Sequence, residues 1–170
     1  MTTNFGQASG TVSFLDFGNL VGSAALNAGV ATLTTASLAA GPHAIVAVYA
    51  GDAGHNASSS VELDEIIQSA NQTSTSVVLA AAGTLRFRGP GIMLTATVNP
   101  GAGSAGGSVD FYNGNRLVGT MSLDASGEAS ITASELNTGG NAVRAAYSGD
   151  SNFGGSISAA IIVYRSPRPR

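Results

Sequence analysis

Apolar and polar residues alternate in short segments along most of the chain. In the segment that begins at Gly10, Val12 and Phe14 fall on one side, and Thr11 and Ser13 fall on the other. A period of two predicts a β-strand with one face turned towards a core. Gly, Asn and Pro separate the segments, which is typical of strands joined by tight turns. Further strands are expected at residues 20–26, 29–38, 43–51, 56–66, 74–80 and 91–98.

The two halves of the sequence repeat one another. Residues 107–119, GSVDFYNGNRLVG, align with residues 10–22, GTVSFLDFGNLVG, at an offset of 97. One extra residue near Ser126 changes the offset to 98 for the rest of the repeat. Repetition of this density indicates two copies of one structural unit. The aligned pairs include Val109 with Val12, Phe111 with Phe14, Leu136 with Leu38 and Gly139 with Gly41.

Each copy contains a Y-x-G-D motif at the end of an alternating segment. An Asp in a turn favours an Asx-type conformation, in which its carboxylate accepts hydrogen bonds from backbone N–H groups. The second copy extends the motif to Y-x-G-D-x-x-F, whereas the first has His55 in the place of the final Phe. We interpret the motif as structural, and it comprises Tyr49, Gly51 and Asp52 in the first copy and Tyr147, Gly149, Asp150 and Phe153 in the second.

These motifs resemble those of the bacterial immunoglobulin-like repeats found in large surface proteins and adhesins. The resemblance covers residues 10–63 and 74–163. It implies antiparallel β-sandwiches of seven strands without a disulfide. It also implies a stalk, spacer or adhesive role outside the cell or at its surface, with neighbouring Ig-like domains as partners, and no catalysis. Residues 1–7, MTTNFGQ, lack the features of a signal peptide.

The second copy has two strands, at residues 74–80 and 91–98, before its G-x-V-x-F segment, whereas the first has only nine residues there. We therefore expect an all-β chain of tandem Ig-like sandwiches, the first lacking its two N-terminal strands. Missing strands leave an exposed sheet edge and an uncovered apolar face. The expected organisation is an incomplete repeat at 1–66, a linker at 67–73, a complete repeat at 74–165 and an Arg/Pro tail at 166–170.

The incomplete copy leaves three interpretations open. The chain could be a spacer segment of a longer repeat protein, or residues 2–8 could repair the first copy in part by adding one strand. Alternatively, copies of the chain could associate head to tail and complete one another as a fibre. An uneven charge distribution favours association, because residues 1–70 carry five acidic residues and no Arg or Lys, while residues 71–170 carry seven Arg and five acidic residues. The residues expected to take part are Val12, Phe14, Arg165, Arg168 and Arg170.

The composition disfavours several functional classes. The chain has no Cys, so it can form neither a disulfide nor a thiolate metal site. Its pI of about 5.1 argues against a nucleic-acid partner. No apolar run reaches 18 residues, so no transmembrane helix is expected.

No group of residues in the sequence predicts a catalytic, cofactor or metal site. The segment GAGSAG at 101–106 resembles a dinucleotide-binding loop, but a strand and not a helix is expected after it. Chelation of a metal by His43, His55 and Asp52 is conceivable, although zinc prefers more N and S ligands than these. Binding of a carbohydrate, through scattered aromatic rings at Phe17, Phe87 and Tyr112, or of calcium is a third alternative.

Overall fold

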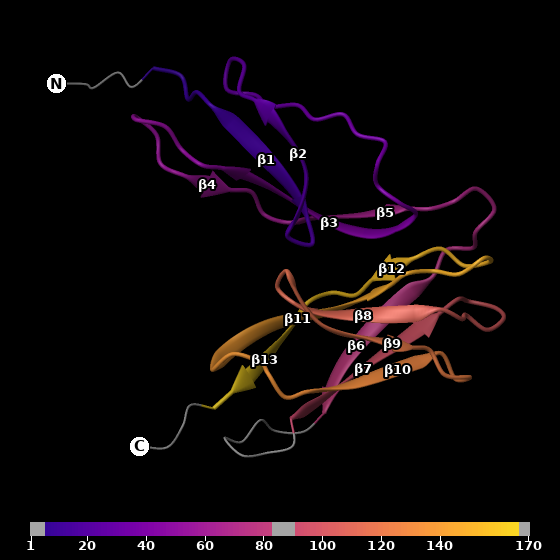
Figure 1. The fold of residues 1–170 in the computed structure, drawn as a ribbon. Helices are drawn as coiled ribbons and strands as arrows, with labels where there is room; N and C mark the ends of the chain where they lie inside the picture. Colours follow the sequence, from indigo (N-terminus) through magenta and orange to yellow (C-terminus); the bar gives the residue numbers. More distant parts are fainter. Residues whose placement is uncertain (1–5, 83–90, 167–170) are drawn as a thin grey trace. The chain divides into compact units, whose positions relative to one another are not determined.

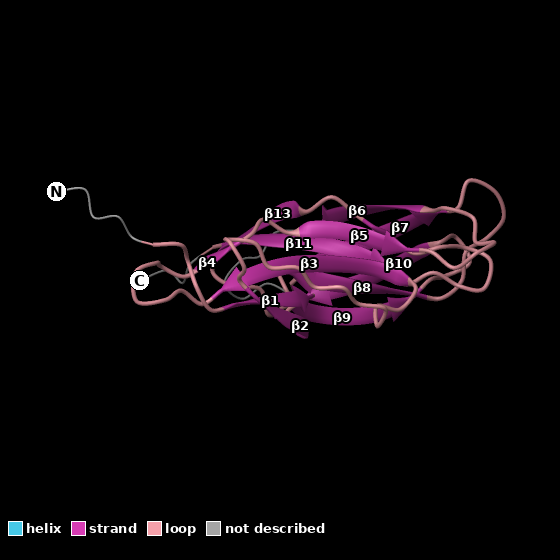
Figure 2. Ribbon diagram, turned by 90° about the horizontal axis from the view of Figure 1, so that it is seen from above, coloured by secondary structure: helices cyan, strands magenta, loops and turns pink. Residues whose placement is uncertain are grey.

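The computed structural model describes residues 6–82 and 91–166, and this part of the chain consists of strands and loops without a helix (Figure 2). The prediction of an all-β chain is therefore confirmed. The chain divides into two compact units. Unit 1 contains residues 1–39 and 43–65, and unit 2 contains residues 40–42 and 66–170.

Unit 2 is a sandwich of two antiparallel sheets (Figure 1). The first sheet has the order β10-β7-β6 and comprises β6 (Ser76–Ala82), β7 (Ile92–Asn99) and β10 (Glu128–Ala133). The second sheet has the order β12-β11-β8-β9, with β13 also paired to β11. It comprises β8 (Ser108–Asn113), β9 (Arg116–Ser122), β11 (Gly139–Tyr147), β12 (Ser156–Ile157) and β13 (Ile161–Arg165).

The core of unit 2 lies between its two sheets. Leu94 from the first sheet and Phe111 and Tyr147 from the second are all 0% exposed. Along β7, buried and more exposed residues alternate, as expected for a strand with one face on a core. Full burial of a large apolar side chain contributes about 1.5–3 kcal/mol, so these residues dominate the stability of the unit.

Unit 1 repeats the second sheet of unit 2 strand by strand. Its order is β2-β1-β3-β4, with β5 also paired to β3. Even the irregularity is repeated, because the register of β1 shifts between Phe14 and Leu15 and that of β8 shifts between Phe111 and Tyr112. The strands are β1 (Thr11–Asp16), β2 (Asn19–Ala25), β3 (Gly41–Tyr49), β4 (Ser58–Ser59) and β5 (Leu63–Ile67).

Among its described residues, unit 1 has no counterpart of the first sheet of unit 2. The strand expected at 29–38 was a wrong prediction, since this segment forms only an isolated bridge between Asn27 and Val30. The equivalent strand of unit 2, β10, is paired along its length with β7. Without such a neighbour, the same alternating pattern does not produce a strand.

A second correction concerns residues 56–66, which were expected to form one strand. The structure divides this segment into the short strand β4 and the separate strand β5. Both parts pair with β3, as β12 and β13 pair with β11 in unit 2. The break between them lies at Ser60, whose N–H and hydroxyl are both bonded to Ala47 of β3. Side-chain bonding of this kind competes with a continuous ladder.

The face of the unit 1 sheet that corresponds to the core of unit 2 is only half-buried. Val12 and Phe14 are partly exposed, whereas their counterparts Val109 and Phe111 are 0% exposed. The same difference holds along β3, where Ile45, Ala47 and Tyr49 are partly exposed and their counterparts Val143, Ala145 and Tyr147 are 0% exposed.

Candidate functional site

The Y-x-G-D motif of unit 2 forms a turn at the end of β11 whose carboxylate bonds two separate segments. One oxygen of Asp150, Oδ1, accepts hydrogen bonds from the N–H groups of Asn152 at 2.7 Å and Phe153 at 2.9 Å. The other oxygen, Oδ2, accepts one from the N–H of Gly106 at 2.7 Å, just before β8. Asp150 therefore fixes its own turn and also holds it against the start of another strand.

Unit 1 contains the same arrangement. Asp52 Oδ1 accepts a hydrogen bond from the N–H of Gly54 at 2.8 Å and lies 2.8 Å from Nδ1 of His55. Asp52 Oδ2 accepts hydrogen bonds from the N–H and the hydroxyl of Ser9, at 2.8 and 2.9 Å. We call this arrangement the turn clamp, which comprises Tyr49, Gly51 and Asp52 in unit 1 and Tyr147, Gly149 and Asp150 in unit 2.

The glycine of each clamp cannot be replaced without strain. Gly51 has a φ of +87° and Gly149 a φ of +84°, a region that residues with a side chain rarely adopt. A Cβ on Gly149 would lie 2.8 Å from the carbonyl oxygen of Phe153, and one on Gly51 would lie 2.7 Å from that of His55. The motif thus needs Gly for both conformation and space.

The clamp carboxylates remain ionised at neutral pH. The hydrogen bond from Gly106 is the main cause that holds the pKa of Asp150 below its usual value, and the bond from Ser9 does the same for Asp52. Burial, together with the nearby negative charge of Asp150, raises the pKa of Tyr147 to about 12. General acid–base catalysis works best with a pKa near the operating pH, so these groups are suited to holding the backbone and not to proton transfer.

The clamp of unit 2 is also bonded to the residues that precede β6. The N–H of Thr73 donates to the carbonyl of Asn152, and the N–H of Gly154 donates to the carbonyl of Thr73, each at 2.8 Å. The side-chain amide of Gln72 donates through Nε2 to the backbone carbonyl of Asp150 at 2.6 Å. Phe153 packs against the core of unit 2. In unit 1 its counterpart His55 makes the bond to Asp52 instead.

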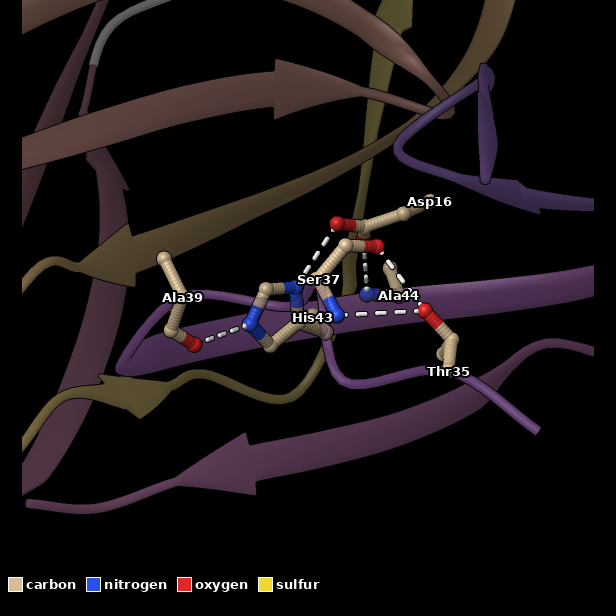
Figure 3. A network of polar contacts seen from close by, with 6 residues as sticks. All are labelled: Asp16, Thr35, Ser37, Ala39, His43 and Ala44. Carbon is tan, nitrogen blue, oxygen red and sulfur yellow. Dashed lines mark hydrogen bonds and ion pairs between the residues drawn. The ribbon is translucent and has the colours of Figure 1, made fainter. Parts of the chain in front are cut away.

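A second polar cluster of unit 1 joins β1 to the start of β3 (Figure 3). Nδ1 of His43 lies 2.7 Å from Asp16 Oδ2, and Nε2 of His43 lies 2.8 Å from the carbonyl oxygen of Ala39. Asp16 Oδ1 also accepts the N–H of Ala44 at 3.0 Å. Both ring nitrogens of His43 therefore face acceptors, an arrangement that favours the doubly protonated imidazolium.

In unit 2, two side-chain amides occupy the positions equivalent to Asp16 and His43. The side-chain N–H of Asn113 donates to Oδ1 of Asn141 at 2.8 Å, and the amide of Asn141 donates to the carbonyl of Asn137 at 2.8 Å. These residues are the repeat counterparts of Asp16, His43 and Ala39. The position therefore serves the fold in both units, although only unit 1 places a titratable pair there.

The Asp16–His43 pair is not part of a catalytic triad. A triad needs the second ring nitrogen beside a nucleophilic hydroxyl. In this structure Nε2 of His43 faces the carbonyl of Ala39, and the hydroxyls of Thr35 and Ser37 lie 2.8 Å from each other (Figure 3).

The three conceivable metal ligands do not form one group, and the described part of the chain contains no group of three or more Asp, Glu, His or Cys side chains that could hold an ion. His55 contacts Asp52, whereas His43 contacts Asp16. The hollows on the surface of unit 2 include one of about 120 Å³ beside Arg116 and Glu135 and one of about 60 Å³ beside Pro100. Ligand pockets usually measure about 300–1,000 Å³, so neither is large enough for an ordinary ligand.

The residues expected to mediate self-association are distributed over both units. Val12 and Phe14 lie on the half-buried face of β1 in unit 1. Arg165 ends β13 in unit 2, where its guanidinium donates to the carbonyl of Leu136. Arg168 and Arg170 lie outside the described residues, as does Phe87. The GAGSAG segment is a connection between β7 and β8, so the strand expected after it is present.

Sequence reasoning did not identify the partners of the clamp carboxylates, Ser9 and Gly106. A signal was available, because the two residues are equivalent at the offset of 97 and each precedes a glycine and the G-x-V-x-F strand. The Asp16–His43 pair was also missed. Its signal was that the positions opposite Asp16 and His43 in the second copy are both Asn.

Two of three comparisons relate this chain to known proteins. The family described as bacterial Ig-like domain (group 3) matches residues 1–68 and residues 70–164. A solved structure of the fibronectin(III)-like modules of Clostridium thermocellum CbhA is 16% identical, with 99% of this chain and 85% of that chain covered; its TM-score of 0.35 is too low to support an argument. A search of curated proteins finds no significant match. A repeated sheet, a repeated clamp and two family matches lead to one conclusion: the chain belongs to the bacterial Ig-like domain (group 3) family and contains two of its repeats.

Proposed function

We propose that this chain is a non-catalytic structural module, a spacer or stalk segment within a bacterial surface or secreted protein. Bacterial Ig-like domains are often extracellular, and Ig-like modules are generally non-catalytic. The observation that carries the proposal is the tandem duplication of one sheet with one turn clamp. A protein selected for a single ligand needs one site, whereas a protein that spans a distance gains from repeating a unit.

The chemistry of the clamp supports this function. All the oxygen bonds described for Asp52 and Asp150 go to groups of the same unit. The carboxylates therefore fix loops and offer little to a substrate. The described residues form strands and loops, and they include no candidate for a membrane-spanning helix.

Single-molecule pulling on the full chain, held between two marker domains, tests the proposal. Unit 2 should resist force and then unfold in one step that releases about 3.3–3.6 Å for each residue in the unit. Gly149→Ala should lower the force of this step, and Gly101→Ala, in an open turn, should lower it less. Smooth extension without a step would contradict a load-bearing spacer.

A self-assembling fibre subunit is the second candidate, and one observation favours it. The described residues of unit 1 form a single sheet whose core-facing side is partly exposed. Light scattering on the purified chain, over a range of concentration and salt, tests this candidate. Growth in mass that salt reverses would support a fibre, and a constant monomer mass would remove it.

Carbohydrate or calcium binding lacks a comparable observation. Calcium takes six to eight oxygen ligands, whereas both carboxylate oxygens of each clamp already accept hydrogen bonds from groups of their own unit. Calorimetry with calcium and a glycan array on the full chain would detect such binding, and a saturable signal in either would replace the spacer proposal with an adhesive one.

A further inference from the structure

We propose that Asn113 and Gly114 form a self-modification site, at which Asn113 loses its amide when unit 2 opens and after which the unit closes with a weaker fold. The proposal goes beyond the spacer function and holds whether or not the chain bears load. Asn113–Gly114 is the only Asn–Gly pair in the sequence. Asn is a chemically labile residue, and a following Gly, which has no Cβ, does not hinder attack on its side chain.

The reaction needs only these two residues and water. The backbone nitrogen of Gly114 loses its proton and attacks Cγ of Asn113, so that a bond forms between these atoms and the bond from Cγ to Nδ2 breaks. Nδ2 takes up the proton and leaves as ammonia. Water then opens the cyclic imide at one of its two carbonyls, which leaves Asp or isoaspartate at position 113. Either product places a new carboxylate at the end of β8.

The folded unit holds both reacting groups on β11. The N–H of Gly114, whose proton has to be lost, donates to the carbonyl of Ala142 at 2.8 Å. Nδ2 of Asn113, the leaving group, donates to Oδ1 of Asn141 at 2.8 Å. The attack requires both bonds to break, because the nitrogen has to turn towards Cγ. The reaction is therefore slow in the folded unit and becomes fast when the turn between β8 and β9 separates from β11.

The partner of the Asn113 side chain is fixed in its orientation. Asn141 is 2% exposed, and its Oδ1 also accepts the N–H of Asn137 at 2.8 Å. Its Nδ2 donates to the backbone carbonyls of Asn137, Gly139 and Val163, at 2.8, 3.1 and 3.3 Å. Turning this amide over would place Oδ1 against these carbonyl oxygens, so Asn141 offers position 113 an acceptor and not a donor.

The product does not fit this partner. A carboxylate at position 113 has no hydrogen to donate, so it faces Oδ1 of Asn141 without a bond between them. Unit 1 shows what a carboxylate needs here, because Asp16, the repeat counterpart of Asn113, lies 2.7 Å from Nδ1 of His43. Unit 2 has Asn141 in the place of that histidine. Position 113 is half-buried, and a polar group that loses its partner in such a place destabilises the fold.

A chemical change that occurs only in the open state makes opening irreversible. If unit 2 opens briefly and closes again, Asn113 stays intact. If the unit is held open, it acquires the carboxylate and then closes with a weaker fold. The equivalent position of unit 1 cannot lose an amide, because Asp16 is already a carboxylate. Of the two equivalent positions, only that of unit 2 therefore retains a mark of how long the unit has been open.

Peptide mapping by mass spectrometry, on the full chain kept at mildly alkaline pH with or without urea, tests the proposal. Conversion of Asn113 should be at least about tenfold faster in urea, because the folded unit has to open before it reacts. Gly114→Ala puts a methyl group beside the attacking nitrogen and should slow the conversion in urea, where the strain of a side chain at a φ of +56° plays no part. Equal rates with and without urea, or no conversion in urea, would overturn the proposal.

Variants that carry the product test its effect on the fold. Asn113→Asp should lower the melting temperature of unit 2 by about 5 °C or more at neutral pH. Asn115→Asp puts the same charge on the exposed neighbouring residue of the turn and should lower it by less than about half as much. Asn113→Asp combined with Asn141→His copies the pair of unit 1 and should recover part of the loss at pH 6. Equal melting temperatures for Asn113→Asp and Asn115→Asp would show that the product fits, and the proposal would fail.

Discussion

Unit 1 and unit 2 contain the same five-stranded sheet but differ in what covers it. The strands, the register shift and the clamp agree between them, although the equivalent core positions are fully buried in unit 2 and partly exposed in unit 1. Local turns and ladders are therefore sufficient to define the sheet. A second sheet is needed to turn its apolar face into a core.

The largest effect is expected from truncating the central Phe of each face. Phe111→Ala should destabilise unit 2 by about 3–5 kcal/mol, because it opens a cavity in a closed core. Phe14→Ala should cost only about 1 kcal/mol, since the side chain that it removes is partly exposed. Urea denaturation, monitored by hydrogen exchange in each unit, measures the loss of unfolding free energy in unit 1 and in unit 2 separately. Equal losses would show that unit 1 has a core as closed as that of unit 2.

The clamp glycine comes next. Gly149→Ala should destabilise unit 2 by about 2–3 kcal/mol, because the new Cβ meets the carbonyl of Phe153 in a left-handed backbone. Gly101 is the matched control: its φ is +76° and no atom lies within 4 Å of a Cβ there, so Gly101→Ala should cost about 1 kcal/mol. Thermal melts of both variants measure the difference. Similar losses would mean that the clamp tolerates the clash by a small shift.

Acid should weaken the clamp. The folded state lowers the pKa of Asp150, so the carboxylate contributes stability above its unfolded pKa near 4, and that stability is lost as the pH falls through the lower folded value. We expect Asp150→Asn to lower the melting temperature of unit 2 by about 4 °C at pH 6 and by less at pH 3. A difference in melting temperature that is the same at pH 3 and at pH 6 would show that the charge of Asp150 does not stabilise the clamp.

The smallest effect concerns the pair that only unit 1 has. Burial disfavours the charge of His43, but its bonds to Asp16 and Ala39 and the nearby Glu65 carboxylate outweigh burial and raise its pKa. A raised pKa contributes stability below about pH 6.5 that is lost as the pH rises through the folded value.

Unit 1 should therefore melt about 1–3 °C lower at pH 8.5 than at pH 6, a shift kept small by the solvent. The double variant Asp16→Asn with His43→Asn copies the Asn113–Asn141 pair of unit 2. It should remove this pH dependence, as followed by circular dichroism. A pH dependence that survives in the double variant would have to come from another group.

The sequence was sufficient to predict most of the strands that have partners within the described chain, although it did not show the break between β4 and β5. The alternation around Val12 and Phe14, together with its copy at Val109 and Phe111, predicted matching strands, and the structure has them. The segment at 29–38 has the same alternation but no strand, because a strand also requires a neighbouring edge. The role of the clamp carboxylates as hydrogen-bond acceptors was partly predictable from the chemistry of turns. Their distant donors, Ser9 and Gly106, were not predictable, because a pattern along the chain does not reveal which loops meet.

The distance that the clamp spans along the chain has a consequence for biosynthesis. The N–H of Gly106 is bonded to a carboxylate 44 residues later, and that of Ser9 to one 43 residues later. At a synthesis rate of about 5–20 residues per second, the start of β8 waits roughly 2–9 s for Asp150 to be made. The hairpin of β6 and β7 is complete before this, with its apolar side exposed during the wait. Unit 2 is therefore vulnerable to aggregation until the last part of its own sequence has left the ribosome.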